Sequence, residues 1–232
     1  MIALKNLSFN FGNNTILEKS TLNFAEKKLT ALIGRNGSGK STLLKALCGL
    51  NKKYEGEIHI DGTNIKDLST QRLAKKIAFV NTSRPKVAKL KCKDIVALGR
   101  SPYTAWHGLL SKEDEKKVME ALEMVGMKDY SNRYFNSLSD GEAQKIMVAR
   151  AIAQDTDIIL LDEPTSFLDL PTRVELIKLL KRLAEKEGKT IIYSTHELDL
   201  ATKFSHYIGL IDSRQLTLHS PTEFSSIDSI FS

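Results

Sequence analysis

The sequence has only two cysteines, and it lacks any run of about 20 apolar residues, the length that crosses a bilayer. Cys48, on the inner face of a predicted helix, and Cys92 lack the paired spacing of a metal or redox motif. We expect both to be reduced, with structural roles. The first residues show no secretory pattern, and internal repeats are missing. These absences disfavour secreted, membrane-spanning and repeat proteins, and they predict a cytosolic protein.

Size and charge are ordinary for a globular protein. The 232 residues fit one large domain or a core with a subdomain, and 41% hydrophobic with 27% charged residues is a typical composition. The net charge of +6 is spread over short basic pairs such as Lys27-Lys28 and Lys75-Lys76. Charge alone therefore does not choose among nucleic acid, an anionic membrane surface and nucleotide phosphates, and solvated faces are the simplest interpretation.

Alternating and apolar runs predict short strands along the chain, near residues 4–11, 29–33, 57–60, 77–80, 158–161, 190–193, 207–211 and 215–219. From about 83 to about 153 a basic irregular stretch is followed by helical segments, where Ser111 precedes Asp114 as a helix cap, and a further amphipathic helix is predicted at about 172–187. Because strands and helices alternate, we expect parallel pairing through right-handed crossovers.

A glycine-rich segment follows the strand predicted at 29–33 and precedes a helix-like run. It fits GxxxxGK[ST], a loop whose backbone N–H groups turn inward around phosphates. We expect Lys40 to reach the β- and γ-phosphates and the Ser41 hydroxyl to bind Mg²⁺. The candidate nucleotide-binding residues are Gly34, Arg35, Asn36, Gly37, Ser38, Gly39, Lys40, Ser41 and Thr42.

Two carboxylates, Asp162 and Glu163, end the apolar run at 158–161. Parallel strands present ligands outside their carboxyl ends, so we expect Asp162 to hold Mg²⁺ through water and Glu163 to act as general base. His196, just past the next apolar run, is predicted to contact the γ-phosphate and the attacking water. The alternatives are a helix cap or surface pair for the acids, and a helix start for His196.

The segment Leu138 to Glu142 precedes another predicted helix, and its Ser139-x-x-Glu142 spacing is that of a capping box. A well-capped helix would explain it. The start of such a helix is also an anion site, because its first N–H groups are free. The segment resembles the LSGGQ signature of ABC ATPases, and it stands just ahead of the acidic pair as in that family.

The resemblance covers essentially the whole chain. The phosphate loop, signature, acidic pair, a D-loop at Ser166 to Asp169 and a switch histidine at His196 follow in family order. It implies that Phe11 stacks on adenine and that Ser139 and Gly141 contact nucleotide. The implied ligands are ATP and Mg²⁺, and the implied activity is ATP hydrolysis coupled to transport.

The same resemblance implies an α/β fold, with a P-loop NTPase core of mixed sheet, an N-terminal antiparallel β part and an α-helical insertion. We expect a single ABC ATPase domain, 1–232, with the RecA-like core and antiparallel part at 1–82 and 154–232 and the helical subdomain at 83–153. In the family, the signature of one subunit closes on the γ-phosphate held by the other.

The partners implied are therefore a second copy, head to tail, with two copies of a membrane permease and a substrate-binding protein, and no nucleic acid. The permease would hold the chain peripherally at the cytoplasmic face of the inner membrane.

A narrower resemblance lies in Asp94 to Tyr103, which includes Gly99-Arg100-Ser101-Pro102. It is similar to a segment in the ATPases of iron–siderophore, haem and vitamin B12 importers, which also continue toward a helix start like Ser111. This favours an importer of that class. Ordinary helix and turn packing is the alternative role.

The sequence departs from the family at two places. Thr82 stands where the family carries a glutamine that reaches Mg²⁺ and water, so we expect the metal contact to be lost or to run through water. The signature carries Asp140 for glycine and Glu142 for glutamine. Their charge weakens phosphate attraction unless the side chains turn away, Glu142 toward the cap.

The sequence leaves two rival functions open. One is a cassette ATPase that acts on ribosomes or DNA, for which the basic charge is weak support; such proteins generally have two cassettes in one chain or long coiled-coil inserts. The other is a small-molecule P-loop kinase, which would explain the phosphate loop but not the signature, D-loop and His196 together.

Overall fold

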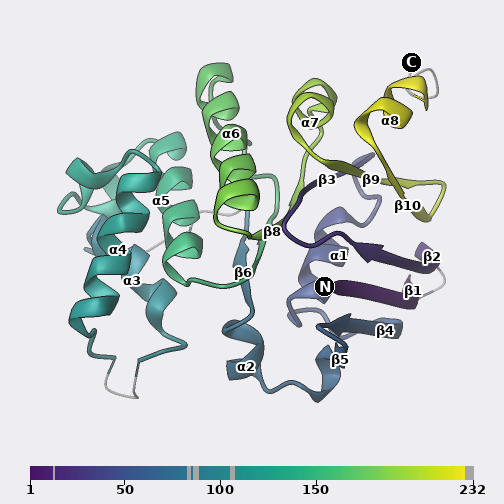
Figure 1. The fold of residues 1–232 in the computed structure, drawn as a ribbon, viewed down its shortest axis with the longest axis horizontal. Coiled ribbons are helices and arrows are strands. Elements are labelled where there is room, and N and C mark those ends of the chain that lie inside the picture. Colours follow the sequence, from purple (N-terminus) through teal and green to yellow (C-terminus); the bar gives the residue numbers. More distant parts are fainter. Residues whose placement is uncertain (13, 83–84, 86–88, 105–107, 228–232) are drawn as a thin grey trace.

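The computed structural model describes residues 1–12, 14–82, 85, 89–104 and 108–227, without the side chains of Phe11, Asn14 and 225–227. Two sheets organise it (Figure 1). The larger has the strand order β10 (Gln215–His219), β9 (Tyr207–Asp212), β3 (Leu29–Gly34), β8 (Thr190–Ser194), β7 (Ile158–Leu161) and β6 (Ile77–Val80). The smaller has the order β2 (Asn14–Phe24), β1 (Ile2–Phe11), β4 (Glu55–Ile60) and β5 (Thr63–Asn64).

Strand direction agrees with the prediction. The strands from β9 through β3, β8 and β7 to β6 pair in parallel, and β10 is an outer strand that pairs antiparallel with β9. The smaller sheet is antiparallel. The helices are α1 (Lys40–Leu47), α2 (Thr70–Ala74), α3 (Cys92–Ala97), α4 (Lys112–Met124), α5 (Asp140–Ala153), α6 (Leu170–Lys186), α7 (Leu198–Phe204) and α8 (Pro221–Ile227).

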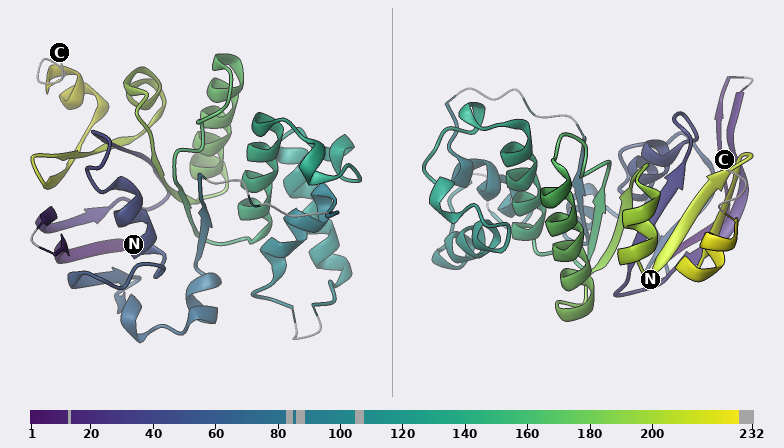
Figure 2. Two further views of the ribbon diagram at one scale, coloured as in Figure 1. Left: turned by 180° about the vertical axis from the view of Figure 1, so that it is seen from behind. Right: turned by 90° about the horizontal axis from the view of Figure 1, so that it is seen from above.

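The parallel strands are apolar on both faces because both faces are covered. Along β7, Ile158 and Leu160 pack with α1 and the antiparallel sheet, whereas Ile159 and Leu161 pack on the side of α5 and α6. Figure 2 shows α3, α4 and α5 gathered at one end of the molecule, beyond α6. Among the described residues, no helix has the length and apolar character needed to span a membrane.

The two cysteines are free thiols, as expected. Cys92 is buried at the start of α3. Cys48 is the C-cap residue of α1, one position beyond the helix on which it was predicted, and it is half-buried. Burial raises the pKa of the Cys48 thiol to about 11, so the reactive thiolate is scarce at neutral pH.

The segment that resembles the importer ATPases has a clear packing role. Arg100 is buried; its Nε donates to Asp114 Oδ1 at 2.8 Å and its Nη1 to the Ala153 carbonyl at 2.8 Å. A Cβ on Gly99 would lie 2.3 Å from the Arg150 carbonyl, so only glycine lets α5 approach this closely. Asp114 also completes the capping box with Ser111 at the start of α4, which confirms the predicted cap.

We expect Asp114→Asn to destabilise the fold by about 3 kcal/mol at pH 7, because it removes one member of a buried ion pair. Hydrogen bonds from Ser111 and Arg100 hold the pKa of Asp114 at about 2, below its ordinary value of 3.8. The carboxylate therefore stabilises the fold above about pH 4, and this contribution disappears as the pH falls toward 2. Urea unfolding of the parent and the Asp114 variant at several pH values measures the difference in their free energies of unfolding. The exposed Asp129→Asn is the control, and equal stability of all three proteins at pH 7 would contradict the prediction.

Candidate functional site

Most candidate residues lie at one edge of the six-stranded sheet, where neighbouring parallel strands end. The phosphate loop follows β3, the acidic pair follows β7, and the residues up to His196 follow β8. Because β3, β8, β7 and β6 are adjacent and parallel, their carboxyl ends meet at this edge. Segments more than a hundred residues apart in the sequence therefore form one site.

The phosphate loop is shaped by close backbone approaches. A Cβ on Gly34 would lie 2.6 Å from both the Ile211 carbonyl and Ser38 Oγ, and one on Gly39 would lie 2.6 Å from Ile16 Cγ2. Gly39 is the N-cap residue of α1, and its φ of 102° favours glycine. The glycines thus let the chain wrap tightly and end at a helix N-terminus.

Lys40 is folded back on this loop. Its Nζ donates to the carbonyls of Gly34 at 2.6 Å and Arg35 at 3.2 Å, and the residue is 5% exposed. Burial lowers the pKa of Lys40, while the nearby carboxylates Glu163 and Asp162 act in the opposite direction. An anion in the loop would add to these carboxylates and further stabilise the charged ammonium group, which burial removes from water.

The loop also fits a phosphate group in other respects. Ser38 Oγ is buried and has no hydrogen-bond partner among the residues that the structure describes. A hollow of about 310 Å³ opens beside the loop, between Ile16, Arg35 and the turn at Asp212 to Arg214. Phe11 is the last residue of β1, and its side chain lies outside the described part.

Three hydroxyl groups converge on Asp162. Ser41 Oγ and Ser194 Oγ each donate to Asp162 Oδ1 at 2.8 Å, and Thr82 Oγ1 donates to the Asp162 backbone carbonyl at 2.9 Å. Asp162 is 3% exposed. Thr82 therefore ties the end of β6 to the end of β7.

A Mg²⁺ ion fits the Ser41–Asp162 pair. Mg²⁺ prefers oxygen ligands and is commonly held by one or two carboxylates together with substrate phosphates. Among the described residues, no group of three or more His, Cys, Asp or Glu side chains could form a metal cage. A hydroxyl and a carboxylate in contact beside a phosphate loop are the oxygen ligands that such an ion would share with nucleotide.

Glu163 is held in an unusual backbone conformation. Its φ is 46°, its N–H donates to Ser194 Oγ at 2.8 Å, and its Oε2 accepts from Ser166 Oγ at 3.0 Å. The D-loop serine and the end of β8 thus contact opposite parts of this residue. His196 is exposed just after β8.

A second polar cluster joins the D-loop to the segment after His196. Glu197 Oε1 accepts from Thr165 Oγ1 at 2.9 Å and lies 3.3 Å from Arg173 Nη1. Arg173 Nε also donates to the Leu168 carbonyl at 2.7 Å. Sequence reasoning did not single out Thr165 or Arg173, because a threonine in a loop and an arginine on a helix face carry no pattern of their own.

The signature segment has the predicted cap. Ser139 Oγ accepts from the Glu142 N–H at 3.3 Å, and Glu142 Oε2 accepts from the Ser139 N–H at 2.8 Å and hydroxyl at 2.9 Å. These bonds, first of all the one from the Ser139 N–H, lower the pKa of Glu142. The expectation that Glu142 turns toward the cap is confirmed, while Asp140 is exposed. A Cβ on Gly141 would lie 3.2 Å from Leu168 Cδ2, so the segment packs beside the D-loop.

Within one chain the signature and the phosphate loop lie apart. Figure 1 places the strands β6 and β8 of the larger sheet between α5, which carries the signature, and α1, which follows the loop. Lys40, Ser41, Asp162 and Glu163 therefore form one group, and Ser139 and Gly141 belong to another.

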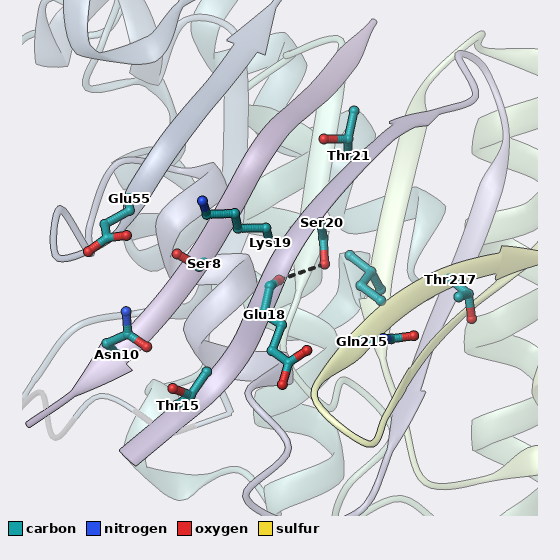
Figure 3. Close-up of a pocket in the computed structure, with 11 residues that line it drawn as sticks. Ser8, Asn10, Thr15, Glu18, Lys19, Ser20, Thr21, Glu55, Gln215 and Thr217 are labelled. Atoms are coloured by element: carbon teal, nitrogen blue, oxygen red, sulfur yellow. Dashed lines mark hydrogen bonds between the residues drawn. The ribbon is translucent and has the colours of Figure 1, made fainter. Parts of the chain in front are cut away.

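A hollow of about 600 Å³ between the antiparallel sheet and β10 lies away from this chemistry (Figure 3). Glu18, Lys19 and Glu55 at its walls are exposed, and Ser20 Oγ donates to the Glu18 carbonyl at 3.0 Å. Its charged side chains are exposed to solvent, so it is a surface depression.

Comparison with known proteins decides the family. The model of the family described as ABC transporter matches residues 17–166. The chain belongs to the ABC transporter family. The cassette is 39% identical over 223 residues, 96% of this chain and 88% of the relative, to the petrobactin import ATP-binding protein YclP of Bacillus subtilis. It is 36% identical to the iron(3+)-hydroxamate import ATP-binding protein FhuC of the same organism, over 89% of this chain and 77% of the relative.

Solved structures agree. A dimeric cassette in a post-hydrolysis state, bound to ADP and phosphate, has a TM-score of 0.83 and 32% identity, over 95% of this chain and 99% of that chain. The predicted fold class and the resemblance to siderophore importer ATPases are confirmed. The cassette is an ATP-binding protein and an ATPase.

We expect Arg173→Gln to loosen the D-loop of the cassette, because the substitution removes both the bond to the Leu168 carbonyl and the ion pair with Glu197. Hydrogen exchange of the amides between Thr165 and Asp169 should become at least tenfold faster, since exchange reports local opening. Arg182→Gln, on an exposed position of the same helix, is the control. Unchanged exchange in the Arg173 variant would show that these contacts do not hold the loop.

Proposed function

We propose that this chain is the ATP-hydrolysing subunit of an importer for iron–siderophore, haem or cobalamin. The observation that carries the ATPase part is the convergence of Lys40, Ser41, Asp162 and Glu163 at one sheet edge. The importer class is supported by the buried Arg100–Asp114 pair in the segment that resembles importer ATPases, and by the names of the relatives.

Each residue at the edge has a distinct proposed role. Lys40 and the loop N–H groups bind the β- and γ-phosphates, and Ser41 with Asp162 holds Mg²⁺, which neutralises phosphate charge when bound. Glu163 accepts a proton from the attacking water, and His196 contacts the γ-phosphate. The side chain of Thr82 is shorter than the glutamine of the family, and its bond to the Asp162 carbonyl holds it in place, so we propose that it reaches the metal only through water.

The second group of residues supports a head-to-tail homodimer. Ser139 and Gly141 lie apart from the loop of their own chain, so they would contact nucleotide on a second copy. Phe167 of the D-loop and Leu170, the first residue of α6, are 66% and 63% exposed and would be covered in such a pair. The Ser139 hydroxyl donates to Glu142, so phosphate contact requires this carboxylate to release it.

A cleft of about 630 Å³ supports a permease partner. It lies between the end of α1, α2, the end of β6 and α5, with Leu50, 69% exposed, and Leu98, 51% exposed, in its walls. Among the described residues, the charged side chains in its lining are all basic: Lys52, Lys66 and Arg150. The Nε of Arg150 is buried and has no hydrogen-bond partner among the described residues. We propose that a permease segment with an apolar face and acidic side chains fills this cleft and holds the cassette at the cytoplasmic face of the inner membrane.

The test is to tag the chain in its native cell, purify it from solubilised membranes and identify what accompanies it by mass spectrometry. We expect a polytopic permease in about equal amount, encoded with a substrate-binding protein. Leu98→Glu should lower permease recovery at least tenfold, because it places a carboxylate in an apolar contact.

Leu109→Glu is the matched control, since Leu109 is 72% exposed and outside the cleft lining. Equal loss of permease in both variants would contradict docking in the cleft. Ribosomal proteins or DNA-repair factors in place of a permease would overturn the transport assignment while leaving the ATPase chemistry in place.

A further inference from the structure

Ser194 touches both members of the acidic pair. Its Oγ donates to Asp162 Oδ1 and accepts from the Glu163 N–H, each at 2.8 Å. Ser194 is 0% exposed at the end of β8, so solvent does not compete for these bonds. A serine hydroxyl has one hydrogen to donate, and here that hydrogen is given to the carboxylate.

The two bonds constrain different properties of the site. The bond to Oδ1 fixes the rotation of the Asp162 carboxylate, and therefore the direction of its other oxygen. The bond from the Glu163 N–H anchors a residue whose φ of 46° is uncommon for a side chain other than glycine. One hydroxyl thus sets the geometry of the proposed metal ligand and of the proposed general base.

Ser41 cannot do this alone. It shares Asp162 Oδ1 with Ser194, at the same 2.8 Å, but its oxygen is also the proposed metal ligand. Ser194 is the second hydroxyl group on Oδ1, and it has no proposed part in binding the metal. Thr82 holds the Asp162 backbone and leaves the carboxylate untouched.

We propose that Ser194 is a positioning residue for ATP hydrolysis, which orients Asp162 toward the metal and fixes the backbone of Glu163. This inference rests on the proposed roles of those two acids. Groups that orient metal ligands change metal affinity about 10- to 100-fold when they are removed. Ser194 therefore affects metal binding even when no hydrolysis takes place.

The test measures the affinity of the purified cassette for the nucleotide analogue AMP-PNP, with Mn²⁺ and with EDTA. The dissociation constant in EDTA divided by that in Mn²⁺ isolates the contribution of the metal to nucleotide affinity. Ser194→Ala should reduce this ratio at least tenfold and leave the affinity in EDTA within twofold of the parent. If the alanine protein does not fold, Ser194→Cys, of similar volume and with a weak donor, carries the same expectation.

Ser205→Ala is the matched control. Ser205 is also buried, 6% exposed, and its hydroxyl bonds to the Tyr193 hydroxyl at 3.0 Å without touching the acidic pair. A ratio unchanged in the Ser194 variant, or reduced equally in the Ser205 variant, would overturn the inference.

Ser41→Ala tests the proposed metal site independently of Ser194. If it reduces the ratio and Ser194→Ala does not, only the role of Ser194 is wrong. If Ser41→Ala leaves the ratio unchanged, the proposed metal site is wrong as well.

Discussion

The hydrogen bonds to Asp162 are the constraint on which the rest of the site depends. Ser41, Ser194 and Thr82 belong to the ends of three structural segments, and each donates to this one residue. Because Asp162 is nearly inaccessible to water, an unmatched carboxylate there would be costly, so the three hydroxyls and the fold stabilise one another. The sheet order β3–β8–β7–β6 brings them to the same edge.

The phosphate loop and the signature segment also hold their polar groups in internal hydrogen bonds. Lys40 satisfies its ammonium group on loop carbonyls, and the Ser139 hydroxyl is satisfied by Glu142. In the proposed dimer, both groups would bind phosphate of one ATP, the ammonium group from one subunit and the hydroxyl group from the other. Binding must therefore exchange internal hydrogen bonds for bonds to phosphate, and the acidic signature makes that exchange harder through its charge.

Much of the fold could be predicted because its signals are local. The apolar run at β7 and the capping boxes at Ser111 and Ser139 depend on neighbouring residues, and the structure has them. The long strand β2 was missed, since irregularities in its pairing with β1 break the alternation that identifies a strand. The contacts of Ser194 with the acidic pair and of Arg173 with Glu197 join separate segments of the chain, and such partners cannot be inferred from one sequence. The subdomain boundaries and the site roles stay predictions.

The most direct test is a structure of the Glu163→Gln cassette with ATP and Mg²⁺. We predict a dimer in which Lys40 Nζ has left the loop carbonyls for phosphate oxygens, the Ser41 hydroxyl oxygen binds the metal, and Ser194 Oγ stays within hydrogen-bond distance of Asp162. A metal bound without Ser41 or Asp162, or a carboxylate that has turned away from Ser194, would contradict the account.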